Sequence, residues 1–94
     1  METGRLAFVW DYEVSEHQFR ALLAGGPPFG RLDRDWAALR LLEYAPYDQI
    51  RAFLGFGELV RGWPGWRPRI RSVTRRRGLD FLVGWLTTER PDLL

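Results

Sequence analysis

A chain of 94 residues with no cysteine and a formal net charge of +2 has room for one small domain. The missing cysteine excludes disulfides and cysteine-ligated zinc, and every apolar stretch falls short of the roughly 20 residues that a membrane-spanning helix needs. We therefore expect a single domain over residues 1–94, without a membrane segment or a secretory leader, in the cytoplasm.

Charge is distributed unevenly along the chain. All 14 basic residues are arginine and asparagine is absent too, which indicates a coding bias as much as selection for chemistry. Residues 1–50 hold five arginines against eight acids, whereas residues 51–94 hold nine arginines against four acids. The chain is a charge dipole, and a count of arginines alone is weak evidence for a binding site.

The first residues predict an extended arm over residues 1–14. Leu6, Phe8 and Trp10 alternate with their neighbours, which is typical of an extended segment, and we expect it to pack across helices. Ser15 and Gln18 then have the spacing of a capping box, which predicts a helix starting at residue 16. Two glycines and two prolines end this helix near residue 24.

Three further short helices are predicted up to residue 62, so that residues 15–62 are mainly helical. Asp33 can cap the second helix, and Pro46 fits the first position of the third. Gly55 closes the third helix, and a very short fourth is expected over residues 58–62. The third and fourth have the brevity of a helix-turn-helix, although the fourth lacks polar side chains that read bases.

Prolines predict an interruption after the fourth helix. Pro64 and Pro68, with Gly65 between them, favour an extended, polyproline-like connector over residues 63–71. A last helix over residues 72–88 is capped by a serine or threonine at its start. The predicted fold is mainly α, with four to five short helices and an extended N-terminal arm. Its expected inward-facing side chains are Trp36, Leu39, Leu42, Phe53, Leu79, Phe81, Leu82 and Trp85.

The strongest functional signal is the basic segment, residues 61–77. It holds seven arginines and no acid, with two tryptophans among them. Guanidiniums this close together need water, internal carboxylates or an external polyanion to neutralise them. The candidate residues for binding a partner or nucleic acid are Arg61, Trp63, Trp66, Arg67, Arg69, Arg71, Arg75, Arg76 and Arg77.

Three interpretations of the basic segment stay open. Its arginines can pair with the acidic N-terminal half, bind nucleic-acid phosphates bidentately, or meet an acidic protein partner. The two tryptophans are better interpreted as core anchors than as platforms for bases, because so small a domain needs large side chains inside. Arg75, Arg76 and Arg77 crowd the first turn of the last helix, where cations oppose the helix dipole, so no local structural reason for them is evident.

Catalytic and metal signals are weak. Glu13, Glu16 and His17 have a spacing that can ligate a metal, but acids at a helix start are more often a solvated cap. No glycine-rich sequence fits a phosphate cradle, and with one histidine and no cysteine we expect neither an enzyme nor a cofactor nor a metal.

Apolar motifs give the chain a family resemblance. They are Phe8 to Tyr12 (FVWDY), Arg34 to Ala45 (RDWAALRLLEYA), Arg67 to Arg69 (RPR), Phe81 and Trp85. The chain resembles an uncharacterised family of small bacterial and archaeal proteins that open with Phe-Trp-Asp-Tyr and have a helix ending in Leu-Glu-Tyr. Here Val9 interrupts the opening pair. Some members are companions of nucleotidyltransferase-type toxins, so the resemblance implies an antitoxin-like role.

The expected function is a non-catalytic interaction module, antitoxin-like or regulatory, whose arginine-rich surface contacts an acidic protein surface or a phosphate backbone. The first alternative is sequence-independent binding of DNA or RNA through the same arginines. A second alternative is self-association, in which the acidic half of one chain meets the basic half of another to form a homo-oligomer.

Overall fold

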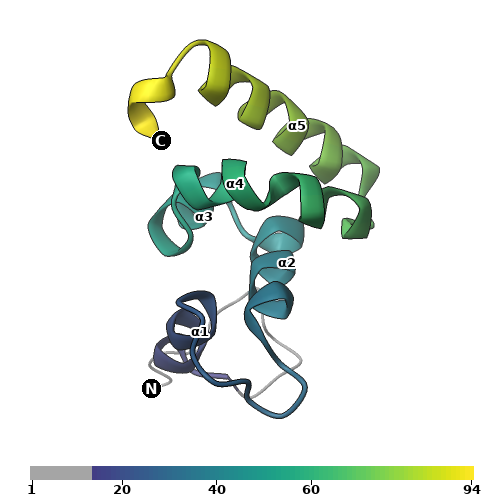
Figure 1. The fold of residues 1–94 in the computed structure, drawn as a ribbon. Helices are drawn as coiled ribbons and strands as arrows, with labels where there is room; N and C mark the ends of the chain where they lie inside the picture. Colours follow the sequence, from purple (N-terminus) through teal and green to yellow (C-terminus); the bar gives the residue numbers. More distant parts are fainter. Residues whose placement is uncertain (1–13) are drawn as a thin grey trace.

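The computed structural model describes residues 14–94, so the N-terminal arm expected over residues 1–14 lies outside the described residues, apart from its last one. The described part holds five α-helices and no strand, which confirms the mainly α fold (Figure 1). The helices are α1 (Glu16–Leu23), α2 (Arg34–Tyr44), α3 (Tyr47–Phe53), α4 (Phe56–Trp66) and α5 (Val73–Thr88). Two 3-10 helices follow α4 and α5, at Arg67–Arg69 and Pro91–Leu93.

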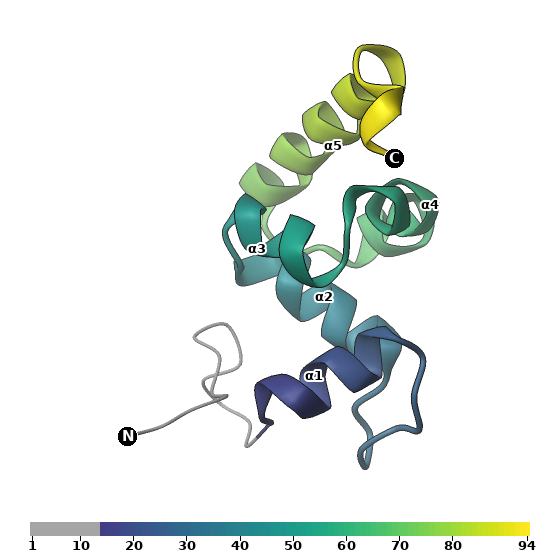
Figure 2. The same cartoon turned by 90° about the vertical axis from the view of Figure 1, so that its left-hand side faces the viewer.

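The helices are stacked from one end of the molecule to the other. Figures 1 and 2 show α1 at one end, α5 at the opposite end, and α2, α3 and α4 between them. Every helix contributes to one core, whose largest fully buried side chains are Phe19, Leu22, Leu41, Leu42, Ile50, Leu59, Leu79 and Leu86. Burial of these apolar groups is the main source of stability in a domain of this size.

The capping signals in the sequence place three helix starts correctly. Ser15 accepts a hydrogen bond from the N–H of Gln18 at 3.1 Å, and the Gln18 side chain accepts one from the N–H of Ser15 at 2.9 Å. Asp33 accepts from the N–H of Trp36 at 2.9 Å. Ser72 accepts from the third residue of α5 at 3.2 Å. Each side chain satisfies an N–H group that would otherwise lack a partner at a helix start.

The predicted connector over residues 63–71 is wrong in its first half. Helix α4 does not stop at residue 62 but continues through Pro64 to Trp66, and a 3-10 helix follows at once. A proline inside a helix removes one backbone hydrogen bond and costs about 3 kcal/mol. Something outside the local sequence must therefore stabilise this turn.

Two buried tryptophans provide that stabilisation. Trp63 and Trp66 lie three residues apart, so both side chains face the core, where they are 5% and 4% exposed. Each aromatic side chain removes about 150–250 Å² from water, which is worth about 4 kcal/mol or more at about 25 cal/mol per Å². The burial of both side chains outweighs the cost of the proline. Helix α4 therefore continues to Trp66.

The predicted core is correct on one side of α5 and wrong on the other. Leu79 is fully buried and Leu82 is partly buried against the core. Phe81 and Trp85, which were expected to face inward, are 63% and 38% exposed. Helix α5 carries apolar residues on two faces. One face packs against α4, α2 and the C-terminal 3-10 helix, whereas Phe81 and Trp85 are exposed (Figure 1).

The close approach of Trp66 to Gly62 predicts opposite effects for two glycines of α4. A Cβ at Gly62 would lie 2.3 Å from the Trp66 ring, whereas a Cβ at Gly65 would meet nothing within 4 Å. We expect Gly62→Ala to lower the free energy of unfolding by about 1–3 kcal/mol through overpacking. We expect Gly65→Ala to leave it unchanged or raise it by up to about 1 kcal/mol. Urea unfolding followed by circular dichroism measures both, and equal effects would contradict the packing described.

Candidate binding surface

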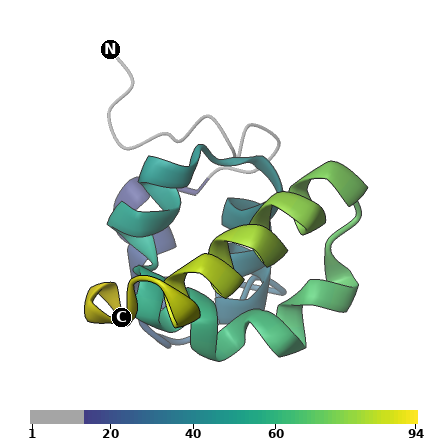
Figure 3. The ribbon, with the colours of Figure 1, turned by 90° about the horizontal axis from the view of Figure 1, so that it is seen from above.

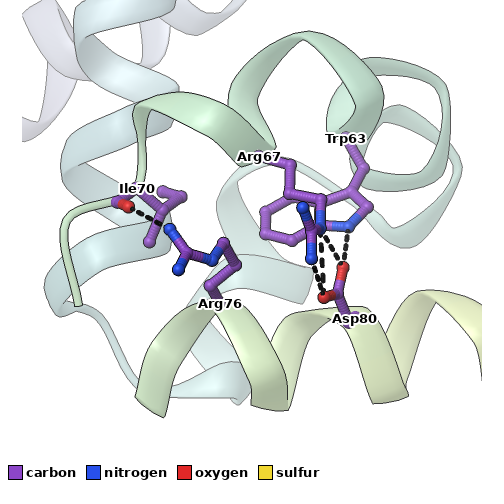
Figure 4. A network of polar contacts seen from close by, with 5 residues as sticks. All are labelled: Trp63, Arg67, Ile70, Arg76 and Asp80. Carbon is purple, nitrogen blue, oxygen red and sulfur yellow. Dashed lines mark hydrogen bonds and ion pairs between the residues drawn. The ribbon is translucent and has the colours of Figure 1, made fainter. Parts of the chain in front are cut away.

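Arg67 is bound to an internal carboxylate. Its Nε and Nη2 atoms donate to both carboxylate oxygens of Asp80 on α5, at 2.8 to 3.0 Å (Figure 4). The indole Nε1 of Trp63 donates to the same carboxylate at 2.8 Å. Asp80 thus holds the end of α4 against α5, and Arg67 is committed to the fold.

The contacts with Arg67 and Trp63 shift the acidity of Asp80. The hydrogen bond from Arg67 holds the pKa of the Asp80 carboxyl below its usual range, and the bond from Trp63 acts in the same direction. The carboxylate also raises the pKa of Arg67, chiefly through the same hydrogen bond. Both shifts favour the charged pair, so the contact is present at neutral pH.

Arg75 joins the start of α5 to the end of α2. Its Nε donates to the carbonyl of Leu42 at 2.9 Å, and its Nη2 donates to the carbonyl of Ala45 at 2.6 Å. In return, the carboxylate of Glu43 accepts from the N–H of Arg71 at 2.8 Å, just before α5 begins. Arg75 therefore has a structural role that its local sequence did not reveal: it donates hydrogen bonds to carbonyls at the end of another helix.

The remaining arginines of the basic segment differ in how firmly they are held. Arg76 donates to the carbonyl of Ile70 at 3.2 Å (Figure 4), and Arg61 pairs with Glu58 one turn earlier at 2.9 Å. The contact of Arg69 with Asp35 is long, at 3.7 Å. No hydrogen bond, ion pair or ring contact is made by the side chains of two others within residues 14–94. These two are Arg71 and Arg77.

Within residues 14–94, the carboxylates that pair with arginine side chains of the basic segment come from both halves of the chain. Asp35, which faces Arg69, lies in the acidic N-terminal half, whereas Asp80 and Glu58 lie in the basic half itself. The tryptophans are core anchors, as expected. Trp63 bonds to Asp80, and the Nε1 of Trp66 donates to Asp35 at 3.0 Å. Neither buried ring presents a free face for stacking on a base.

A groove runs along α2 beside the 3-10 helix and is lined by both arginines and apolar side chains. Its volume is about 470 Å³, and its described lining is Arg31, Asp33, Trp36, Leu39, Arg40, Glu43, Tyr44, Arg69, Ile70 and Arg71. Arg69 also lines a second hollow of about 290 Å³ beside Arg61 and Gly62. The structure thus brings Arg69 together with Arg71 in the groove and with Arg61 in the second hollow, whereas Arg77 on α5 lines neither.

Two groove arginines are absent from the sequence-based candidates. Arg40 follows Trp36 by four residues and precedes Tyr44 by four, and it lies over both rings at 5.9 and 5.1 Å. That spacing on one helix face was a usable signal. Arg31 lies in the loop before α2, and no local pattern marks it.

The two acids of the groove are already engaged with backbone groups. Asp33 caps α2 through the N–H of Trp36, and Glu43 accepts from the N–H groups of Arg71 and Ser72. Their oxygens are held by these amides, while Arg31 and Arg71 have side chains without a bonded partner among residues 14–94. The described groove lining holds four arginines against two carboxylates, together with apolar side chains, so it is a cationic surface suited to an anionic ligand.

The other sequence candidates give no site in the described part of the chain. Residues 14–94 contain no cluster of three acidic, histidine or cysteine side chains that is able to hold a metal ion. Glu13, one of the three residues considered for a metal, lies outside the described residues, and Glu16 pairs with Arg20 at 3.0 Å. None of the described helices has the length and apolar character that crossing a bilayer requires.

Comparison with known proteins adds no relative to this picture. No protein family, curated protein or solved structure matches the chain.

The Asp80 contacts predict a stability that depends on pH. Because the folded-state pKa of Asp80 is lowered, its contribution is present above the unfolded pKa of about 3.9 and is lost as the pH falls through the folded value. The advantage of wild type over Asp80→Asn, less than about 1 kcal/mol for so exposed a pair, should shrink in acid. Asp80→Ala should cost more, about 1–3 kcal/mol, because Trp63 loses its acceptor. Urea unfolding at neutral and acid pH measures both, and a wild-type advantage that grows in acid would contradict the assignment.

Single substitutions in the arginine triplet should have different effects on the free energy of unfolding. Arg75→Ala leaves two carbonyls at the end of α2 without their donor, so we expect a loss of about 1–3 kcal/mol. Arg77→Ala removes a side chain with no internal partner and should change stability by less than about 0.5 kcal/mol. Thermal unfolding of both variants in dilute solution makes the comparison. Equal losses would show that the junction between α2 and α5 does not depend on Arg75.

Proposed function

We propose that the chain is a non-catalytic interaction module, of the antitoxin or regulatory-accessory kind that the sequence resemblance implies. Its ligand is an acidic segment of a partner protein, bound in the groove along α2. The observation that carries the proposal is the composition of the groove. Its described lining combines four arginines with apolar side chains, and its two carboxylates accept hydrogen bonds from backbone amides.

The groove chemistry suits a segment that alternates acidic and apolar side chains. A guanidinium offers a planar pair of donors that matches a carboxylate bidentately, and Arg31 and Arg71 are available for this. Trp36, Leu39 and Ile70 offer apolar surface for the side chains between the acids. Desolvation by such apolar contacts strengthens each neighbouring charge pair.

Two observations favour a protein partner over nucleic acid. A phosphate backbone is bound by many free cations, but Arg67, Arg75 and Arg76 are held by internal acceptors. The two tryptophans of the basic segment, Trp63 and Trp66, are also buried, so neither can serve as the stacking platform that binding of single strands uses. What remains free is a small group of arginines beside apolar surface.

Fluorescence anisotropy with a labelled short peptide of alternating glutamate and leucine tests the proposal. The double variant Arg31→Ala with Arg71→Ala should bind the peptide about tenfold or more weakly, which corresponds to about 1.4 kcal/mol. Arg51→Ala is the matched control, because this α3 arginine lines neither hollow and should leave affinity unchanged. A peptide with glutamine in place of glutamate should bind more weakly than the acidic one.

Nucleic acids in the same assay provide the contradicting outcome. Duplex DNA or single-stranded RNA that binds more tightly than the acidic peptide, with an affinity that falls steeply and linearly in log salt, would make the nucleic-acid interpretation correct instead. Equal losses for the groove variant and for Arg51→Ala would place peptide binding outside the groove.

A further inference from the structure

The outer face of α5 carries an exposed row of residues at four-residue spacing. The row, called here the α5 ridge, consists of Arg77, Phe81, Trp85 and Glu89. Phe81 is 63% exposed and Trp85 is 38% exposed. Seen from above in Figure 3, no other element of the described chain lies over α5 along its length. Large exposed aromatic side chains arranged contiguously on a small domain usually mark an interaction surface.

The charged ends of the α5 ridge are also without partners. Within residues 14–94, neither the Arg77 nor the Glu89 side chain makes a hydrogen bond or an ion pair. Neighbouring charges on the C-terminal turn are engaged, since Arg90 pairs with Asp92 at 2.9 Å. Along the α5 ridge, the order is therefore one basic residue, two aromatic residues and one acidic residue. Each charged side chain can pair with an opposite charge on another molecule.

This order makes the α5 ridge complementary to itself in an antiparallel arrangement. Two copies related by a two-fold axis near residue 83 place Arg77 against Glu89 of the other copy, and Phe81 against Trp85 of the other copy. Rows at four-residue spacing are the ridges that interlock in the commonest class of helix pairs. A two-fold axis repeats each contact, so two ion pairs flank two aromatic pairs.

Gly84 leaves room for such an approach. It lies beside the α5 ridge, and a Cβ at this position would meet nothing within 4 Å. An aromatic ring from a second helix can thus settle against the backbone of α5. Aromatic pairs of this kind contribute about 0.5–1.5 kcal/mol beyond the burial of their area.

We propose that the chain forms a symmetric homodimer through the α5 ridge, in which Phe81 and Trp85 of one copy pack against Trp85 and Phe81 of the other and Arg77 pairs with Glu89. The contact differs from head-to-tail pairing of acidic and basic halves, since it uses one face of one helix. A 16-residue helix is about 24 Å long, so the area is below that of a standard interface, and the dimer is a weak one that forms at micromolar concentration.

Sedimentation equilibrium of the full chain over a range of micromolar concentrations tests the dimer. Wild type should self-associate, and Phe81→Glu should be monomeric with unchanged far-ultraviolet circular dichroism, because Phe81 is mostly exposed in the monomer. Arg77→Glu and Glu89→Arg should each weaken association about tenfold or more. The double variant that swaps both charges should recover affinity to within about threefold of wild type.

Arg71→Glu is the matched control, because it makes the same charge change in the basic segment but lies before α5 begins and outside the α5 ridge. It should leave association through the α5 ridge unchanged, whereas head-to-tail pairing of the two halves would weaken. A wild-type chain that stays monomeric leaves the ridge to a different protein and overturns the proposal. A charge swap that fails to restore association overturns it as well, as does a loss caused equally by Arg71→Glu.

Discussion

The end of α2 and the start of α5 are joined because a charged side chain from each helix bonds to backbone groups at the end of the other. The position of the basic segment depends on that junction. Glu43 lies near the C-terminus of its own helix and Arg75 near the N-terminus of its own, so each opposes the dipole of the helix that carries it. Across the junction both become favourable. Glu43 accepts from N–H groups at the start of α5, and Arg75 donates to carbonyls at the end of α2. Each charge thereby satisfies polar groups that a helix end leaves without partners.

The same exchange determines which arginines remain for a ligand. A segment that looks uniformly basic is divided by the fold into members that support it, such as Arg67 on Asp80 and Arg75 on α2, and members whose side chains face solvent. Along α2 the second group outnumbers the nearby carboxylates, since four arginines and two acids line the described groove. The free charge therefore gathers along α2 and at Arg77 on α5, and each location has apolar surface beside it. These are the two surfaces that we propose for an acidic partner and for a second copy.

Local signals in the sequence predicted much of the fold, because caps and turn residues act within a few positions. Ser15 and Asp33 marked helix starts correctly for this reason. The path through Pro64 was not predictable in the same way, because Trp63 and Trp66 are held by carboxylates 17 and 31 residues away. The faces of α5 were ambiguous since both are apolar, and the positions of α4 and α2 decide which one is buried. For the binding surface, the sequence identified the candidate arginines. Which of them are bound internally and which face solvent depends on tertiary contacts, and these cannot be predicted from spacing along the chain.

Nuclear magnetic resonance of the arginine Nε–H protons tests this division most directly, because each side chain reports separately. The account predicts that the protons of Arg67 and Arg75 exchange slowly with water and keep their shifts when an acidic peptide is added. The proton of Arg71 should exchange rapidly and shift on binding. If Arg67 and Arg75 exchange as rapidly as Arg71, or if they are the ones that shift, the arginines are not divided between fold and surface as described.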